Sequence, residues 1–210
     1  MSASIETSSD SMVAGATASQ LAGLCFALLA GQFLTVIMLA ASIAPDYDVT
    51  VTAISDLGVI PETALIFNFS LLVTGTLNII GSALLFGRTR KWASLIIASI
   101  AGFGAIGAGL ITLASPGVHG IFALLAFVFF NIQMLVGAAG VRGILRAVGL
   151  GLGLVGLAYV VLMFFGDAGY PQLFGPIGHG GTERMIVYPP MLWYLVYGGA
   201  LLGGMPTRLH

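Results

Sequence analysis

Long apolar runs dominate the chain, and short segments with polar residues, glycine or proline separate them. A helix of about 20 apolar residues crosses the hydrocarbon core of a membrane. Runs of about this length cover residues 20–44, 63–86, 92–113, 120–140, 147–166 and 186–204. The third and fourth belong to one uncharged stretch, which we divide at SPGVHG because proline and glycine favour a tight turn. The pattern predicts an all-α membrane protein, a bundle of six transmembrane helices.

The segment that precedes the first apolar run is rich in Ser, Thr and Ala. Terminal segments are commonly poorly ordered unless they dock on the rest of the chain. We therefore predict a flexible N-terminal tail over residues 1–19 and a six-helix transmembrane domain over residues 20–205.

Composition supports the membrane assignment and excludes one class of partner. Charged residues make up 7% of the 210 residues, whereas an average soluble domain has roughly 25%. The net charge of −1 argues against nucleic acid as a partner, because binding phosphates requires a basic face. The 30 glycines fit close packing of membrane helices, which associate through small residues.

The charges divide between the two sides of the predicted bundle. One side receives six of the seven basic residues, namely Arg88, Arg90, Lys91, Arg142, Arg146 and Arg208. The other side receives six of the eight acidic residues, namely Asp46, Asp48, Asp56, Glu62, Asp167 and Glu183. Cytoplasmic connections carry an excess of Lys and Arg. We therefore predict a multi-pass protein of the cell membrane with both termini cytoplasmic.

Each predicted outer connection carries residues that can take part in chemistry. Ser55 and Asp56 lie in the first connection, His119 in the second, and His179 and Glu183 in the third. Both histidines occur in the pattern P-x-x-H-G. Three helical hairpins would thus present polar groups at one membrane face.

One hypothesis is a metal site formed by Asp56, His119 and His179. Zinc binds such nitrogen and oxygen ligands, and an open position would hold an activated water. Glu183 would then act as general base, and Ser55 would hold a water or a substrate oxygen. The alternative is structural, with the histidines in the headgroup region and Asp56 capping a short helix.

The segment before the last apolar run raises similar alternatives. Glu183 suits the N-terminal end of the sixth helix, where a carboxylate is favoured. Arg184 can bind an anionic lipid headgroup through its guanidinium group, contact a partner protein, or pair with Glu183. Pro189 and Pro190 lack backbone N–H groups and predict a kink or a restart of this helix.

Within the predicted spans the polar side chains are few and uncharged: Gln32, Asn68, Asn78, Asn131 and Gln133. Proton relays and charge-coupled transporters use ionisable groups inside the membrane. Their absence from the predicted spans argues against transport.

Three short motifs resemble an uncharacterised family of small integral-membrane proteins, domain of unknown function 998. They are AISDLG at 53–58, HG at 119–120 and GGTERMIVYPPMLW at 180–193, and the resemblance extends from about residue 20 to 205. AISDLG is also distantly similar to the Frag1/DRAM/Sfk1 membrane proteins, some of which act in lipid remodelling or organisation.

A more distant similarity is to alkaline ceramidases, which use Ser, Asp and three His around zinc. That resemblance implies catalytic roles for Ser55, Asp56 and His119, with His179 as a second histidine. No counterpart of the third histidine is found, because His210 lies on the opposite side of the predicted bundle.

We therefore predict a non-catalytic accessory or structural subunit, or a lipid-organising protein, with polar outer loops. Its partners would be membrane lipids and other membrane or extracytoplasmic subunits, with no cofactor. The alternative is a metal-assisted lipid hydrolase, with zinc, at the extracytoplasmic membrane surface.

Overall fold

The computed structural model describes the backbone of residues 3–204 and the side chains of residues 18–204. Its long helices are α1 (Ala3–Ile43), α2 (Ala64–Thr89), α3 (Trp92–Leu110), α4 (Pro116–Ala139), α5 (Gly143–Asp167) and α6 (Gly178–Leu202). Two 3-10 helices, η1 (Ser55–Gly58) and η2 (Pro171–Ile177), lie in connections. The described residues contain six helices long and apolar enough to cross a membrane and no strand. The predicted all-α six-helix bundle is confirmed.

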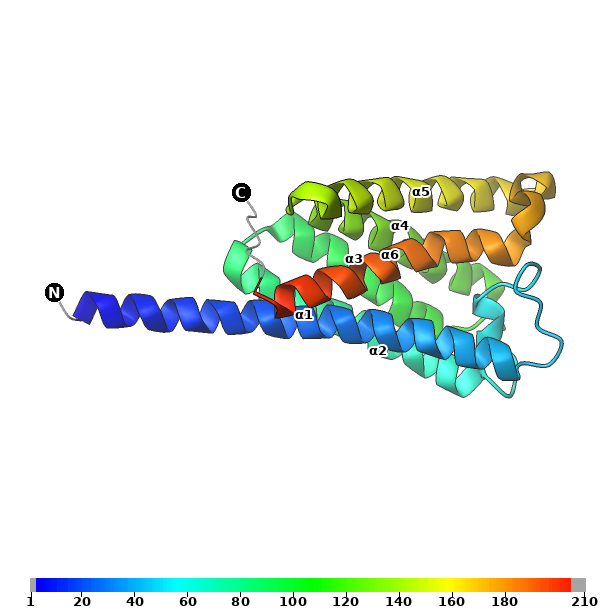
Figure 1. Cartoon of the computed structure of the whole chain (residues 1–210). Helices are drawn as coiled ribbons and strands as arrows, with labels where there is room; N and C mark the ends of the chain where they lie inside the picture. The colour runs from blue at the N-terminus through cyan, green and yellow to red at the C-terminus, as the bar shows by residue number, and fades with distance from the viewer. Residues whose placement is uncertain (1–2, 205–210) are drawn as a thin grey trace.

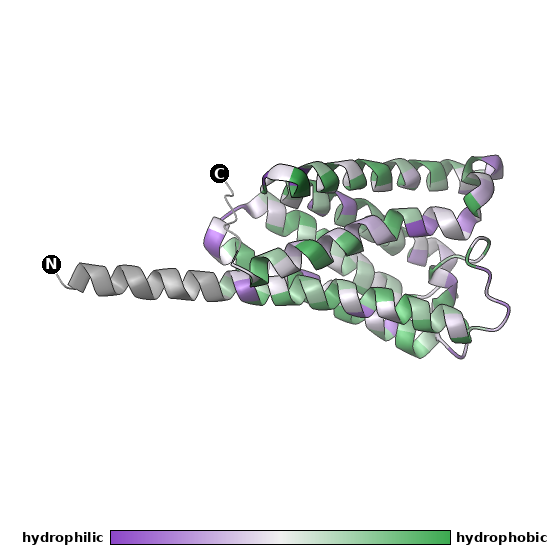
Figure 2. Cartoon of the chain, viewed as in Figure 1, coloured by the Kyte–Doolittle hydropathy of each residue, from purple (hydrophilic) through white to green (hydrophobic). Residues whose placement is uncertain are grey.

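The six helices run side by side along one direction (Figure 1). Each packs against the next, and α6 packs against α1, so that the helices form a closed ring. We call the end formed by residues 44–63, 111–115 and 168–177 the loop end. At the opposite end, the termini end, α1 begins and α6 finishes. Hydrophilic residues gather in the connections, whereas the helices are mostly hydrophobic (Figure 2).

Two helix boundaries differ clearly from the sequence prediction. Residues 3–19, predicted as a flexible tail, continue α1 in the N-terminal direction; their mobility stays a prediction. The last helix begins at Gly178 rather than near residue 186 and runs without a break through Pro189 and Pro190. Of the two predicted alternatives, a restart at the prolines is therefore wrong, and a kink stays a prediction.

A hydrogen bond from a neighbouring helix explains how α6 accommodates the proline pair. Pro190 has no N–H, so the carbonyl of Ile186, four residues earlier, lacks its usual helical partner. The Asn131 side chain of α4 donates Nδ2–H to this carbonyl at 3.1 Å. A polar residue of one span thus supplies one of the two hydrogen bonds that the prolines remove from another.

Other uncharged polar residues of the spans also join helices. Asn78 of α2 and Gln133 of α4 exchange two amide hydrogen bonds of 2.9 Å. Gln32 of α1 donates to Thr74 of α2 at 2.7 Å and accepts a bond of 2.7 Å from Ser70. These bonds fix the positions of α1 and α4 against α2, where apolar contact alone gives little specificity.

Glycine allows α1 and α6 to touch through their backbones. A Cβ atom added to Gly23 would lie 2.6 Å from the carbonyl oxygen of Gly198, and the converse substitution gives the same distance. Any side chain at these positions would force the helices apart. The close approach holds the last helix against the first and so closes the ring.

Candidate functional site

A cavity of about 400 Å³ lies at the loop end between η1, α4, α5 and α6. Its polar lining consists of Ser55, Asp56, His119, Asp167, His179 and Glu183. The apolar lining deeper in the bundle includes Leu124, Phe127, Val160, Met163, Phe164 and Ile186. Every residue proposed from the sequence for catalysis or metal binding therefore lines one cavity, although the three connections lie far apart along the chain.

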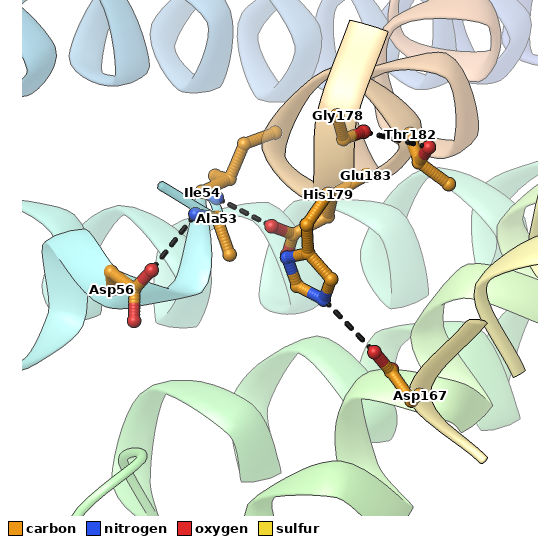
Figure 3. A network of polar contacts seen from close by, with 8 residues as sticks. All are labelled: Ala53, Ile54, Asp56, Asp167, Gly178, His179, Thr182 and Glu183. Atoms are coloured by element: carbon orange, nitrogen blue, oxygen red, sulfur yellow. Dashed lines mark hydrogen bonds and ion pairs between the residues drawn. The ribbon is translucent and has the colours of Figure 1, made fainter. Parts of the chain in front are cut away.

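Glu183 joins α6 to the first connection. Its side chain is 3% exposed, and its Oε2 accepts a hydrogen bond from the backbone N–H of Ile54, directly before η1 (Figure 3). The prediction that Glu183 caps the sixth helix is wrong. Because α6 begins at Gly178, Glu183 lies beyond the first turn and binds a different segment.

Asp56 forms a local hydrogen bond within the first connection. Its Oδ2 accepts a hydrogen bond from the backbone N–H of Ala53 at 2.8 Å. A side chain that binds the N–H three residues earlier is one half of a capping box. Asp56 lies inside the first turn of η1 rather than at its N-cap. The carboxylate therefore shapes the turn and also lines the cavity.

His119 is buried at the cavity wall, with an exposed fraction of 4%. Its Nδ1 lies 2.7 Å from the carbonyl oxygen of Ile111. Because a carbonyl oxygen only accepts, Nδ1 carries the proton in the neutral ring and Nε2 is left as an acceptor. This Nε2 is buried and has no hydrogen-bond partner among the described residues.

His179 pairs with a residue that sequence reasoning did not connect to it. Its Nε2 lies 3.2 Å from Oδ1 of Asp167, the last residue of α5 (Figure 3). The ring also packs edge-on against Phe174, with centroids 5.0 Å apart. The sequence signal that could have indicated this pair is the position of Asp167 at the end of a predicted helix, twelve residues before His179.

The expected zinc ligands lie around one cavity but do not form a metal site in this arrangement. Among residues 18–204, no group of three or more His, Cys, Asp or Glu side chains is placed to hold a metal ion. Asp56, His119 and His179 each bind a different protein group. Zinc binding stays a prediction that needs these side chains to rearrange.

Arg184 faces the first connection and is not part of the cavity lining. Its guanidinium group donates to the carbonyl oxygens of Val49 and Gly180 at 2.9 and 2.8 Å. It also donates to the Tyr47 hydroxyl at 2.7 Å, which itself donates to the Ala53 carbonyl. Burial raises the pKa of Tyr47, an effect that the neighbouring Arg184 opposes. The binding of a headgroup or partner by Arg184 stays a prediction.

Glycines at the start of α6 let the first connection lie directly on this helix. The N–H of Gly180 donates to the carbonyl of Thr50 at 2.9 Å. A Cβ on Gly178 or Gly180 would collide with carbonyl oxygens of Thr50 or Thr52, and Gly178 has a φ of +66°. The concentration of glycine and charge at residues 175–184 therefore serves to attach the first connection to α6.

The model of one family, described as a protein of unknown function (DUF998), matches residues 15–200. No curated protein matches the chain. No solved structure matches it either.

Proposed function

The chain belongs to this family of unknown function, and we propose that it is a non-catalytic, lipid-organising protein that takes an amphiphile into its loop-end cavity. The observation that carries the proposal is the division of one cavity into a polar part and an apolar part. Ligand pockets of proteins span roughly 300–1,000 Å³ and combine apolar walls with a few placed polar groups. The loop-end cavity has this size and composition.

The rim of the cavity supports entry from the lipid phase. Leu124 of α4 and Phe164 of α5 line the cavity, and their side chains are 45% and 61% exposed. In a bilayer such exposed apolar side chains contact acyl chains. An amphiphile could thus place its headgroup among the polar residues while its tail leaves between α4 and α5.

The charge distribution supports an extracytoplasmic loop end in the cell membrane. Arg88, Arg90, Lys91, Arg142 and Arg146 lie at the termini end, as the positive-inside rule expects of the cytoplasmic side; Arg208 lies outside the described residues. The polar segments of the loop end would then be available to other membrane or extracytoplasmic subunits. The protein would act as an accessory component that presents or retains lipid.

A cavity-filling variant tests lipid binding. Gly120 lines the cavity, and a Cβ there would meet no atom within 4 Å, so Gly120→Leu fills space without a clash at its base. Gly151 of α5 also has open space and lies outside the lining, so Gly151→Leu is the matched control. Lipids retained through purification are identified by mass spectrometry.

We expect one lipid class to be retained by wild type and by Gly151→Leu and to be lost from Gly120→Leu. Equal retention by both variants, or no enrichment of any lipid by wild type, would contradict the proposal.

The alternative is a metal-assisted lipid hydrolase, favoured by the convergence of Ser55, Asp56, His119, His179 and Glu183 on one cavity. Metal content distinguishes the two. Stoichiometric zinc in purified wild type that disappears in His119→Ala, together with release of a lipid fragment by wild type, would support the hydrolase. The non-catalytic proposal expects neither result.

A further inference from the structure

The polar lining of the loop-end cavity has more acceptors than donors: three carboxyl groups and Nε2 of His119 accept, whereas the donors are the Ser55 hydroxyl and the His179 ring, which is already paired with Asp167. Asp56, Asp167 and Glu183 supply carboxyl groups, and the lining contains no lysine or arginine. Arg184 directly follows Glu183 in the sequence, but its guanidinium group binds the first connection instead of lining the cavity. A phosphate or carboxylate headgroup would therefore enter without a counter-charge from Lys or Arg and close to carboxylates of the same sign.

The tautomer of His119 adds another acceptor to this wall. The Ile111 carbonyl holds the proton on Nδ1, which leaves Nε2 as an acceptor without a partner. A buried acceptor without a hydrogen bond costs free energy that a suitable donor restores. The ring lines the cavity, so a bound molecule could supply that donor after a small side-chain rotation.

We propose that the cavity selects a single-chain amphiphile whose headgroup donates hydrogen bonds and carries no negative charge, such as a monoacylglycerol or a long-chain amine. This inference rests on the proposed function, because it names the class of amphiphile that the cavity takes. Hydroxyl or ammonium hydrogens of the headgroup bind Asp56 and Nε2 of His119. The single tail passes Leu124 and Phe164 into the bilayer.

The experiment measures binding of three radiolabelled probes to the full-length protein in lipid nanodiscs. Monopalmitoylglycerol has a neutral hydroxylated headgroup, hexadecylamine is a cation, and palmitate is an anion, while all three carry tails of similar length. We expect the first two to bind wild type about tenfold more tightly than palmitate, the scale of one hydrogen bond to a charged group.

Two variants locate the selectivity. His119→Phe keeps a buried ring and removes the acceptor, so monopalmitoylglycerol binding should weaken severalfold while palmitate binding stays the same. Asp56→Asn keeps an oxygen for the Ala53 N–H and removes the charge. It should weaken binding of hexadecylamine and strengthen that of palmitate, and it remains informative if His119→Phe does not fold.

The outcomes separate this inference from the proposed function. If palmitate binds wild type as tightly as the other probes and Gly120→Leu abolishes all binding, the cavity binds amphiphiles and the headgroup assignment is wrong. If no probe binds wild type, or if Gly120→Leu binds as well as Gly151→Leu, both proposals are wrong.

Discussion

At the residue scale, two neighbouring side chains of α6 hold the first connection from opposite directions. Glu183 accepts from the N–H of Ile54, and Arg184 donates to carbonyls of the same connection. Buried backbone N–H and C=O groups need partners, and an irregular segment at the membrane surface cannot supply all of them from its own backbone. Glu183 and Arg184 therefore take the place of secondary structure in positioning the first connection, which carries Asp56.

Removing the carboxyl group tests this role of Glu183. Glu183→Ala leaves the Ile54 N–H without its acceptor, and we expect a loss of about 1–3 kcal/mol in the free energy of unfolding. Glu183→Gln keeps an accepting oxygen and should lose less. Thermal unfolding in detergent reports the loss, and faster hydrogen exchange confined to residues 49–56 reports its location.

Glu62→Ala removes an exposed acid of the same connection and serves as the control, with an expected change within about 0.5 kcal/mol. Equal stability of Glu183→Ala and Glu62→Ala would show that the bond to Ile54 does not hold the connection.

At the element scale, the helices are joined by a few specific contacts, because burial of apolar side chains gives little preference in lipid. Amide pairs link α2 to α4, and glycine contact links α1 to α6. The proline pair of α6 leads to a third contact of this kind, because Asn131 of α4 donates a hydrogen bond to the carbonyl that Pro190 leaves without a helical partner. Each of these contacts holds one helix in place through a specific residue of a neighbouring helix.

The relation between Asn131 and Pro190 can be tested with a double-mutant cycle. Asn131→Ala should cost about 1–2 kcal/mol of stability, because the Ile186 carbonyl loses its donor. Pro190→Ala restores a helical N–H to that carbonyl, so the same Asn131→Ala change should cost less in a Pro190→Ala background. Additive effects on thermal unfolding would rule out the coupling.

The contact between α1 and α6 is tested by two adjacent substitutions. Gly198→Leu forces a side chain into the backbone of α1 and should cost about 1–3 kcal/mol or more. At Gly199 a Cβ meets no atom within 4 Å, so Gly199→Leu is a control one residue away. Size-exclusion profiles and melting temperatures of the two variants should differ clearly; similar values would mean that the close approach is not needed.

At the scale of the whole molecule, the bundle has two chemically different ends. All described basic residues except Arg184 lie at the termini end, while the cavity and most acidic residues lie at the loop end. The helices between them carry no Lys or Arg near their middle. This asymmetry sets the expected orientation and therefore the side from which the cavity is reached.

Cysteine labelling tests the orientation directly. In a Cys25→Ala background, Glu62→Cys places one thiol at the loop end, and Arg90→Cys places one at the termini end. A membrane-impermeant maleimide added to intact cells should label Glu62→Cys, whereas Arg90→Cys should react only after lysis. The reverse pattern would put the cavity on the cytoplasmic side.

The sequence alone determined that this chain forms six apolar helices and the order in which short connections join them. Hydropathy acts on each segment separately, so its length and composition suffice. The ends of the helices were harder to predict. The helix α6 begins at Gly178, where the first connection packs on it, and this connection is far away in sequence.

Only the tertiary structure decided what the polar residues do. The sequence placed Ser55, Asp56, His119, His179 and Glu183 at one face, and the fold brought all five to one cavity. It also assigned Glu183 to Ile54, His179 to Asp167 and Arg184 to Tyr47. Such pairings depend on the rotation of each helix about its axis and on the path of a twenty-residue connection, and no local pattern of hydrophobic and polar residues encodes either quantity.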